Sequence, residues 1–258
     1  MEAISARVTA SFGARSLPSR PTMSCLATVH CSSACAQDGT SAASPNAERS
    51  ARAVTSSPEK AAKPQLPTGC VAASADQASA EAVQRAFMNE VFRVYTHDDV
   101  VGVELAGALK NVAALCCGIS DGCGMGDNTR ALLITRALSE ISRLAECMGG
   151  RKETLAGLAG MGDLIVTCTS MHSRNHRAGI LIGQGKSAQE AMDEVGAVVE
   201  GYYAAQSAWE LAQRKHVSMP ITEAAYAVLY EGRDPREALN SLMLRDRTSE
   251  AEDAAWAR

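Results

Sequence analysis

One apolar stretch of the sequence decides the fold: Gly102-Val103-Glu104-Leu105-Ala106-Gly107-Ala108-Leu109-Lys110-Asn111. Asp98 or Asp99 can cap a helix that contains this stretch and runs to about Cys117. At about 100° per residue, Lys110 shares one face of that helix with small apolar residues: Val103, Ala106, Ala113, Ala114 and Cys117. Another element can therefore approach this face closely, with the lysine either at its edge or buried in it.

The pattern from Asp98 onward is helical throughout. Glycines at 118, 122, 124 and 126 predict a break, after which a long helix runs from Asp127 to about Met148. A second glycine-rich break covers 157–163, and a Thr/Ser-rich loop is expected from Thr167 to Ser173. Shorter helices follow at about 174–183, 187–194, 200–214, 220–231 and 234–241.

Residues 66–98 have a different pattern. They predict a strand over 69–74, a helix over 76–89 and a second strand over 92–96. This is the end of an α/β unit and is too short to close a sheet by itself. The expected fold class is therefore mainly α, with a helical domain over 99–245 preceded by this strand-helix-strand segment.

The two ends of the chain are expected to lack a packed structure. Residues 1–65 are rich in Ala, Ser and Thr and bury too little apolar surface to offset their ordering entropy. Their Ser/Ala/Arg bias also fits an organellar transit peptide, so a plastid or another organelle is an alternative to a cytoplasmic location. Residues 246–258 are charged and are expected to fray.

Composition excludes two classes of protein. The 258 residues carry 25 Lys and Arg against 29 Asp and Glu, a formal net charge of −4, which is not the basic field of a nucleic-acid binder. No apolar run is expected to approach the roughly 20 residues that span a bilayer.

Cysteines and histidines do not form a metal-binding pattern. The nine cysteines include no CxxC pair, and free buried thiols are the expectation. His172 and His176 are four residues apart and could share a helix face, but no third ligand lies near them, so no metal site is predicted.

Two features can carry chemistry. Burial of Lys110 on its small apolar face would favour the neutral amine that general acid-base catalysis near neutral pH requires. The 167–177 loop ends where a helix begins, with Ser173 as cap and Arg174 in the first turn, which suits a phosphate; an ordinary capped surface loop is the alternative. Asp163 is either a helix cap or a carboxylate partner for the lysine.

Four blocks of the sequence, taken in order, resemble the NAD(P)-dependent glycerol-3-phosphate dehydrogenases of bacterial and plastid type. They are 102–111, Gly160-Met161-Gly162-Asp163-Leu164, Ser173-Arg174-Asn175-His176-Arg177 and Val198-Val199-Glu200-Gly201. The similarity covers roughly 66–245. It implies the all-helical C-terminal substrate domain of that family, like that of 6-phosphogluconate dehydrogenase, preceded by the last strands of a Rossmann-like nucleotide domain.

The resemblance also implies a reaction and its residues. The family transfers a hydride reversibly between NAD(P)H and dihydroxyacetone phosphate, giving sn-glycerol 3-phosphate, in glycerophospholipid and carbohydrate metabolism. Lys110 would exchange the proton on the reacting oxygen, and Asp163 would balance the ammonium. The other implied substrate contacts are Asn111, Thr167, Ser173, Arg174 and Asn175. The implied contacts to NAD or NADP are Arg174, Val198 and Glu200.

One departure from the family keeps alternatives open. The sequence has no G-x-G-x-x-G turn between a strand and a helix, so the main body of the nucleotide domain is expected to be missing. The chain could then be a catalytically incomplete substrate-binding or dimerisation module. A dehydrogenase of the phosphogluconate type is a third hypothesis. A homo-oligomer, most simply a dimer, is expected because an exposed strand edge and apolar faces favour association.

Overall fold

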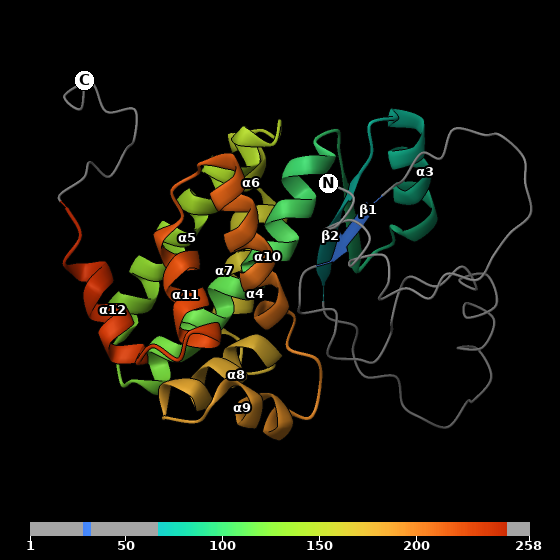
Figure 1. Ribbon diagram of the computed structural model, residues 1–258. Coiled ribbons are helices and arrows are strands. Elements are labelled where there is room, and N and C mark those ends of the chain that lie inside the picture. The colour runs from blue at the N-terminus through green and yellow to red at the C-terminus, as the bar shows by residue number, and fades with distance from the viewer. Residues whose placement is uncertain (1–27, 32–66, 247–258) are drawn as a thin grey trace, which may run out of the picture.

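The computed structural model describes residues 28–31 and 67–246, which form a helical body with a small sheet at one end (Figure 1). The sheet region contains β1 (Thr28–Cys31), β2 (Thr68–Ala73), α3 (Gln77–Phe87) and β3 (Phe92–His97). The helical body contains α4 (Val100–Gly122), α5 (Asp127–Cys147), α6 (Lys152–Leu155), the π-helix η2 (Leu158–Gly162), α7 (Asp163–Thr169), α8 (Arg174–Gly183), α9 (Ala188–Val195), α10 (Glu200–Lys215), α11 (Pro220–Tyr230) and α12 (Pro235–Met243).

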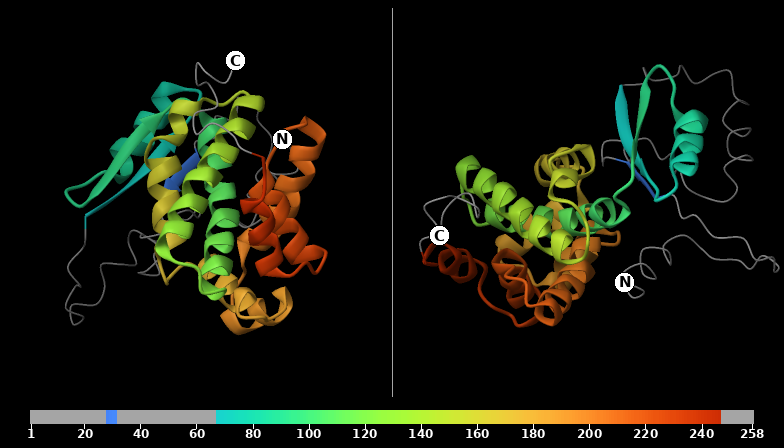
Figure 2. Two further views of the ribbon diagram at one scale, coloured as in Figure 1. Left: turned by 90° about the vertical axis from the view of Figure 1, so that its left-hand side faces the viewer. Right: turned by 90° about the horizontal axis from the view of Figure 1, so that it is seen from above.

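Helix α4 is the centre of the body. Helices α5, α7, α8 and α10 pack around it (Figures 1 and 2), and most of its side chains between Gly102 and Ser120 are buried. Asp99 caps its start, since the Asp99 side chain accepts a hydrogen bond from the backbone N–H of Gly102. The predicted cap is confirmed, and the helix extends five residues beyond the expected end.

The expectation that no apolar stretch approaches membrane-spanning length is wrong for α4. Its 23 residues are long and apolar enough to cross a bilayer by length and composition alone. However, 67% of its most apolar window is buried inside the protein, and a central core helix passes the same test. Neighbouring helices therefore cover the apolar surface that gives α4 this composition.

Two of the glycines expected to break this helix instead hold α8 against it. Gly118 and Gly122 lie within α4, where a Cβ atom would come 2.1 Å from the carbonyl oxygen of His176 and 2.2 Å from that of Ile180. Gly179 and Gly183 of α8 face them in the same way. The turn comes only at Gly124, whose φ of +79° favours glycine. Close approach of two backbones, rather than chain breaking, explains the first two glycines.

The remaining helices confirm most of the sequence predictions, with one correction. The predicted helices beginning near 127, 174, 187, 200, 220 and 234 are present with ends shifted by no more than two residues. The Thr/Ser-rich segment is helical to Thr169, because the second glycine-rich break winds as η2 and continues directly into α7. Only 170–173 remain as a connection, so Thr167 lies on a helix rather than on a loop.

The sheet region has the predicted strand-helix-strand order. β2 and β3 are parallel, in register from Thr68 opposite Phe92 to Ala73 opposite His97. Strand β1 pairs with the other edge of β2 in antiparallel orientation, so 28–31 differ from the expectation that all of 1–65 lacks structure. An open strand edge offers unpaired backbone groups that such a segment can fill. The rest of 1–65 and residues 247–258 lie outside the described residues.

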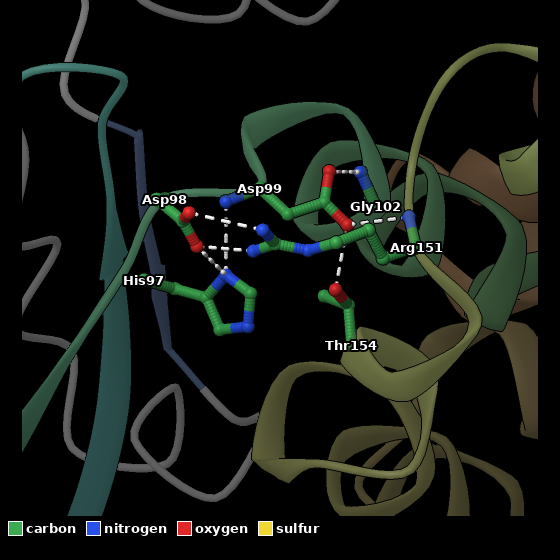
Figure 3. Close-up of polar contacts among 6 residues, drawn as sticks. All are labelled: His97, Asp98, Asp99, Gly102, Arg151 and Thr154. Atoms are coloured by element: carbon green, nitrogen blue, oxygen red, sulfur yellow. Dashed lines mark hydrogen bonds and ion pairs between the residues drawn. The ribbon is translucent and has the colours of Figure 1, made fainter.

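Asp99 joins the sheet region to the helical body (Figure 3). Besides Gly102, its carboxylate accepts hydrogen bonds from the backbone N–H of Arg151 at 2.8 Å and from the hydroxyl of Thr154 at 2.6 Å. Burial acts to raise the pKa of Asp99, but these hydrogen bonds outweigh it and lower the pKa. Next to it, the guanidinium of Arg151 lowers the pKa of Asp98 to about 2. These contacts fix the direction in which α4 leaves β3.

Glu140 of α5 ties α5 to the start of α11. Only 3% of this side chain is exposed, and its carboxylate accepts hydrogen bonds from the backbone N–H groups of Ile221 and Thr222 and from the Thr222 hydroxyl. It therefore serves as the cap that α11 otherwise lacks, because Met219 provides no capping side chain. Burial raises the pKa of Glu140 to about 7, although these hydrogen bonds act in the opposite direction.

We expect Gly118→Ala to destabilise the protein by at least about 2 kcal/mol, because the added methyl group meets backbone rather than a movable side chain. Gly126→Ala is the matched control, since a Cβ there meets nothing within 4 Å. Urea unfolding of both variants measures the difference. Equal stabilities would contradict the close α4–α8 packing.

Glu140 predicts a specific pH dependence of stability. The folded-state pKa of Glu140, about 7, is above the ordinary value of 4.5. Its contribution to the free energy of unfolding is therefore fully present below about pH 4.5 and is lost as the pH rises through 7. The free energy of unfolding of the natural chain, compared with that of Glu140→Gln, should fall by about 3 kcal/mol between pH 4.5 and pH 7.5. Urea titrations at several pH values test this, and a constant difference between the two proteins would contradict it.

Candidate functional site

A buried ion pair between α4 and α7 lies at the centre of the candidate site. Lys110 Nζ contacts Asp163 Oδ2, and only 9% of Lys110 and 1% of Asp163 are exposed. Removing both charges from water costs several kcal/mol each, so such a pair does little for net stability. The sequence left two roles open for Asp163, a helix cap or a carboxylate partner for Lys110. The structure shows Asp163 as the partner of the buried lysine. As the first residue of α7, Asp163 also places its negative charge at the favourable end of that helix dipole.

Thr167 lies one helical turn after Asp163 and is also buried. The Thr167 hydroxyl donates to the backbone carbonyl of Asp163 at 2.6 Å, and Asp163 Oδ1 lies 3.5 Å from the hydroxyl oxygen. The hydroxyl proton is therefore committed to the helix. Thr167 stiffens the turn that carries the carboxylate.

Asn111, the next residue after Lys110, begins a second chain of contacts. Its side-chain oxygen accepts from Asn175 Nδ2 at 3.0 Å, and the Asn175 oxygen accepts from the backbone N–H of Gly201 at 2.7 Å. Asn175 therefore connects α4, α8 and α10. The sequence pattern indicates no role for Gly201, yet a Cβ there would lie 2.5 Å from the carbonyl oxygen of Asn111. Only glycine allows α10 to begin this close to α4.

The beginnings of α8 and α10 carry the remaining predicted residues. Ser173 caps α8 as predicted, accepting from the backbone N–H of His176. Arg174 pairs with Glu200 across the two helix starts, and both side chains are more than 40% exposed. Val198, which precedes α10, is 61% exposed. The structure thus brings the predicted substrate and cofactor residues into one continuous neighbourhood.

His176 is a residue whose placement the sequence did not indicate. It is buried on α8, and its Nε2 lies 3.1 Å from Asp121 Oδ2 of α4, while Arg130 of α5 contacts the same carboxylate. Burial lowers the pKa of His176, although Asp121 acts in the opposite direction. His172 lies before α8 and does not share its face. The pair of histidines is therefore not a site, and His176 anchors the first turn of α8.

The thiols nearest to the site are not activated. Cys116, Cys117 and Cys168 are free and buried. Burial raises the pKa of Cys116, and a hydrogen bond with Cys117 together with burial raises that of Cys168. Since the thiolate is the nucleophile and metal ligand, Cys116 and Cys168 fill space rather than react. Among the residues that the structure describes, no group of three or more His, Cys, Asp or Glu could hold a metal ion.

Comparison with known proteins places this arrangement in a family. A family model described as the NAD-dependent glycerol-3-phosphate dehydrogenase C-terminus matches residues 99–240. Glycerol-3-phosphate dehydrogenase [NAD(P)+] of Desulfitobacterium hafniense is 55% identical over 190 residues, which are 74% of this chain and 54% of that protein. The protein of the same name from a Thermoanaerobacter species is 58% identical over 186 residues, which are 72% of this chain and 56% of that protein.

Solved structures agree. The crystal structure of glycerol-3-phosphate dehydrogenase from Coxiella burnetii matches with a TM-score of 0.69 and 42% identity, covering 70% of this chain and 56% of that chain. A yeast glycerol-3-phosphate dehydrogenase matches with a TM-score of 0.64 and 27% identity, covering 70% of this chain and 55% of that chain. The chain thus spans about half the length of the relatives that it matches. It belongs to the NAD-dependent glycerol-3-phosphate dehydrogenase family, of which it contains the C-terminal domain.

Proposed function

We propose that this chain acts in the reversible transfer of a hydride between NAD(P)H and dihydroxyacetone phosphate, giving sn-glycerol 3-phosphate. The observation that carries the proposal is the buried Lys110–Asp163 pair, which is linked to the capped start of α8 because Asn111, the residue after Lys110, accepts a hydrogen bond from Asn175. A buried charge pair that adds little stability is well explained by chemistry on a small polar substrate.

Proton exchange is the role of Lys110. Reduction of a carbonyl group produces an alkoxide, which needs a proton donor within hydrogen-bond distance. The Lys110 ammonium would donate its proton to that oxygen, and in the oxidation direction the neutral amine would accept it from the alcohol. Asp163 would hold Nζ in place and balance its charge, while Thr167 keeps the turn that carries Asp163 rigid.

Recognition of the phosphate falls to the start of α8. The first N–H groups of a helix and an arginine in its first turn both favour an anion. Arg174 would exchange part of its contact with Glu200 for the phosphate, which its exposure permits. Asn111 and Asn175 would orient the substrate from the side of α4, since their mutual hydrogen bond fixes both amides.

When bound, NADH or NADPH would supply the hydride for reduction, and the oxidised cofactor would accept it in the reverse direction. Arg174, Val198 and Glu200 fit the nicotinamide end of the cofactor, because they lie together and are exposed. The described residues contain no glycine-rich turn for the diphosphate: the β2–α3 connection is Ser74-Ala75-Asp76, and Asp76 caps α3. This observation favours a second candidate function, a substrate-binding or dimerisation module without turnover of its own.

Ligand binding separates these functions. We expect dihydroxyacetone phosphate at millimolar concentration to raise the melting temperature of the chain, and Lys110→Met or Arg174→Met to remove most of that rise. Lys186→Met is the control, because this lysine is half-buried and pairs with Glu194 away from the site. NADH oxidation lost in Lys110→Met supports the enzyme, and binding without oxidation supports the module. Absence of binding, or 6-phosphogluconate binding more tightly, contradicts both.

The ion pair also predicts a stability pattern. Lys110→Met leaves Asp163 as a buried unpaired charge and should cost about 3 to 5 kcal/mol, as should Asp163→Leu. The double variant removes both charges and should lose far less than the two single changes together. Urea unfolding of the four proteins measures this. Additive losses would contradict direct pairing.

A further inference from the structure

The two members of the Lys110–Asp163 pair belong to separate segments of the chain that share one anchor. Lys110 lies on α4, the helix that Asp99 caps, and Asp163 begins α7, which follows α6 and η2. The Thr154 hydroxyl on α6 donates to Asp99 Oδ2 at 2.6 Å (Figure 3), and both side chains are buried. This hydrogen bond therefore joins the segment that carries the ammonium to the segment that carries its carboxylate partner.

The two carboxylate oxygens of Asp99 serve two different helices. Oδ1 caps α4, since it accepts from the backbone N–H of Gly102 at 2.9 Å. Oδ2 accepts from the backbone N–H of Arg151 at 2.8 Å and from the Thr154 hydroxyl, both at the start of α6. Arg151 provides no capping side chain for α6, so Asp99 supplies that cap from a distant segment. A helix as short as Lys152–Leu155 is not stable by itself, so its position depends on the contacts that hold it.

Gly102 provides the space that this double contact needs. A Cβ atom at Gly102 would lie 2.3 Å from Asp99 Oδ2 and 3.1 Å from the Cβ of Thr154. Any larger residue would push the carboxylate away from α6. Glycine at this position therefore allows one carboxylate to reach the starts of both helices.

The path from Thr154 to Asp163 consists of backbone contacts. The Thr154 carbonyl accepts from the N–H of Gly157 at 3.2 Å, and the Gly157 carbonyl accepts from the N–H of Gly162 at 3.2 Å. The second hydrogen bond closes the π-helix η2, and Asp163 follows directly. A Cβ atom at Gly160 would lie 2.1 Å from a carbonyl oxygen at the end of α6, so η2 packs backbone to backbone on α6. A shift of α6 would therefore displace Asp163.

We propose that Asp99 is a positioning residue for the Lys110–Asp163 pair and acts through Thr154. Asp99 caps the helix that carries the lysine and holds the segment that leads to the aspartate, so one carboxylate fixes how the two charges meet. Misplacement of reacting groups by about 1 Å can lower a rate by about a hundredfold. The benefit of this positioning for proton exchange rests on the proposed function, whereas its effect on the geometry of the pair does not.

Thr154→Val tests the proposal, because it removes the hydroxyl and keeps nearly the same shape. Urea unfolding measures the coupling between Lys110→Met and Asp163→Leu, which is the difference between the double variant and the two single variants taken together. We expect this coupling, expressed as a ratio of unfolding constants, to fall at least about fivefold when Thr154→Val is present in all four proteins. An unchanged coupling overturns the proposal.

Thr222→Val is the matched control. Thr222 is 5% exposed and Thr154 is 4% exposed, and the hydroxyl of each donates to a buried carboxylate, which for Thr222 is that of Glu140. Thr222→Val should also lose stability but keep the natural coupling. Thr154→Ser retains the hydroxyl and should keep the natural coupling as well. A reduced coupling in either of these two variants overturns the proposal, because lost stability or lost packing would then explain the effect.

Binding of dihydroxyacetone phosphate separates this proposal from the proposed function. The rise in melting temperature that this compound produces should shrink in Thr154→Val and remain in Thr222→Val. If the natural chain shows no rise, the proposed function is contradicted, while a reduced coupling in Thr154→Val still supports the positioning role. A full rise together with an unchanged coupling in Thr154→Val overturns the positioning role and leaves the proposed function intact.

Discussion

The backbone contact between α4 and α8 is the constraint on which the rest of the structure depends. Gly118 and Gly122 on one helix and Gly179 and Gly183 on the other have no side chains at the points where the two backbones meet. The two backbones can then approach closely enough for the start of α8 to lie beside the middle of α4. Without that approach, Asn175 could not reach Asn111, and the Ser173–Arg174 turn would lie away from Lys110.

Helix α4 is buried on all sides, so a charged side chain in its middle is energetically costly. A helix with neighbours on every face has no room for an unpaired charge, yet Lys110 lies in its middle. Asp163 makes this tolerable, because it approaches from the first turn of α7 and matches the ammonium charge. Stability and the proposed chemistry therefore have opposite preferences at this position: an apolar pair would fold as well, but it could not exchange the proton that the proposed reaction requires.

The two ends of the molecule present different surfaces. At one end, Asp99 and Arg151 fix the sheet region to the start of α4, and the exposed Phe87, Met88 and Tyr95 leave apolar surface there uncovered. At the other end, α10, α11 and α12 present an aromatic wall with balanced charges. The buried Glu140 supports that end, since it holds the start of α11 against α5. Its pKa of about 7 makes this support weaker as the pH rises.

The sequence by itself determined most of the local structure. The cap at Asp99, the cap at Ser173 and the apolar face around Lys110 depend on spacing within a few residues, and the structure has all three. The spacing of residues along the sequence could not show which distant segments contact each other. Gly118 and Gly122 resemble a helix break until α8 is seen against them, and the apolar length of α4 resembles a membrane span until its neighbours cover it. Gly201, His176 and Glu140 were missed for the same reason, because each contacts a segment far away in the sequence: Gly201 packs against Asn111, His176 lies beside Asp121, and Glu140 accepts from Ile221. Contacts between distant segments depend on the packing of whole helices, which only the tertiary structure decides.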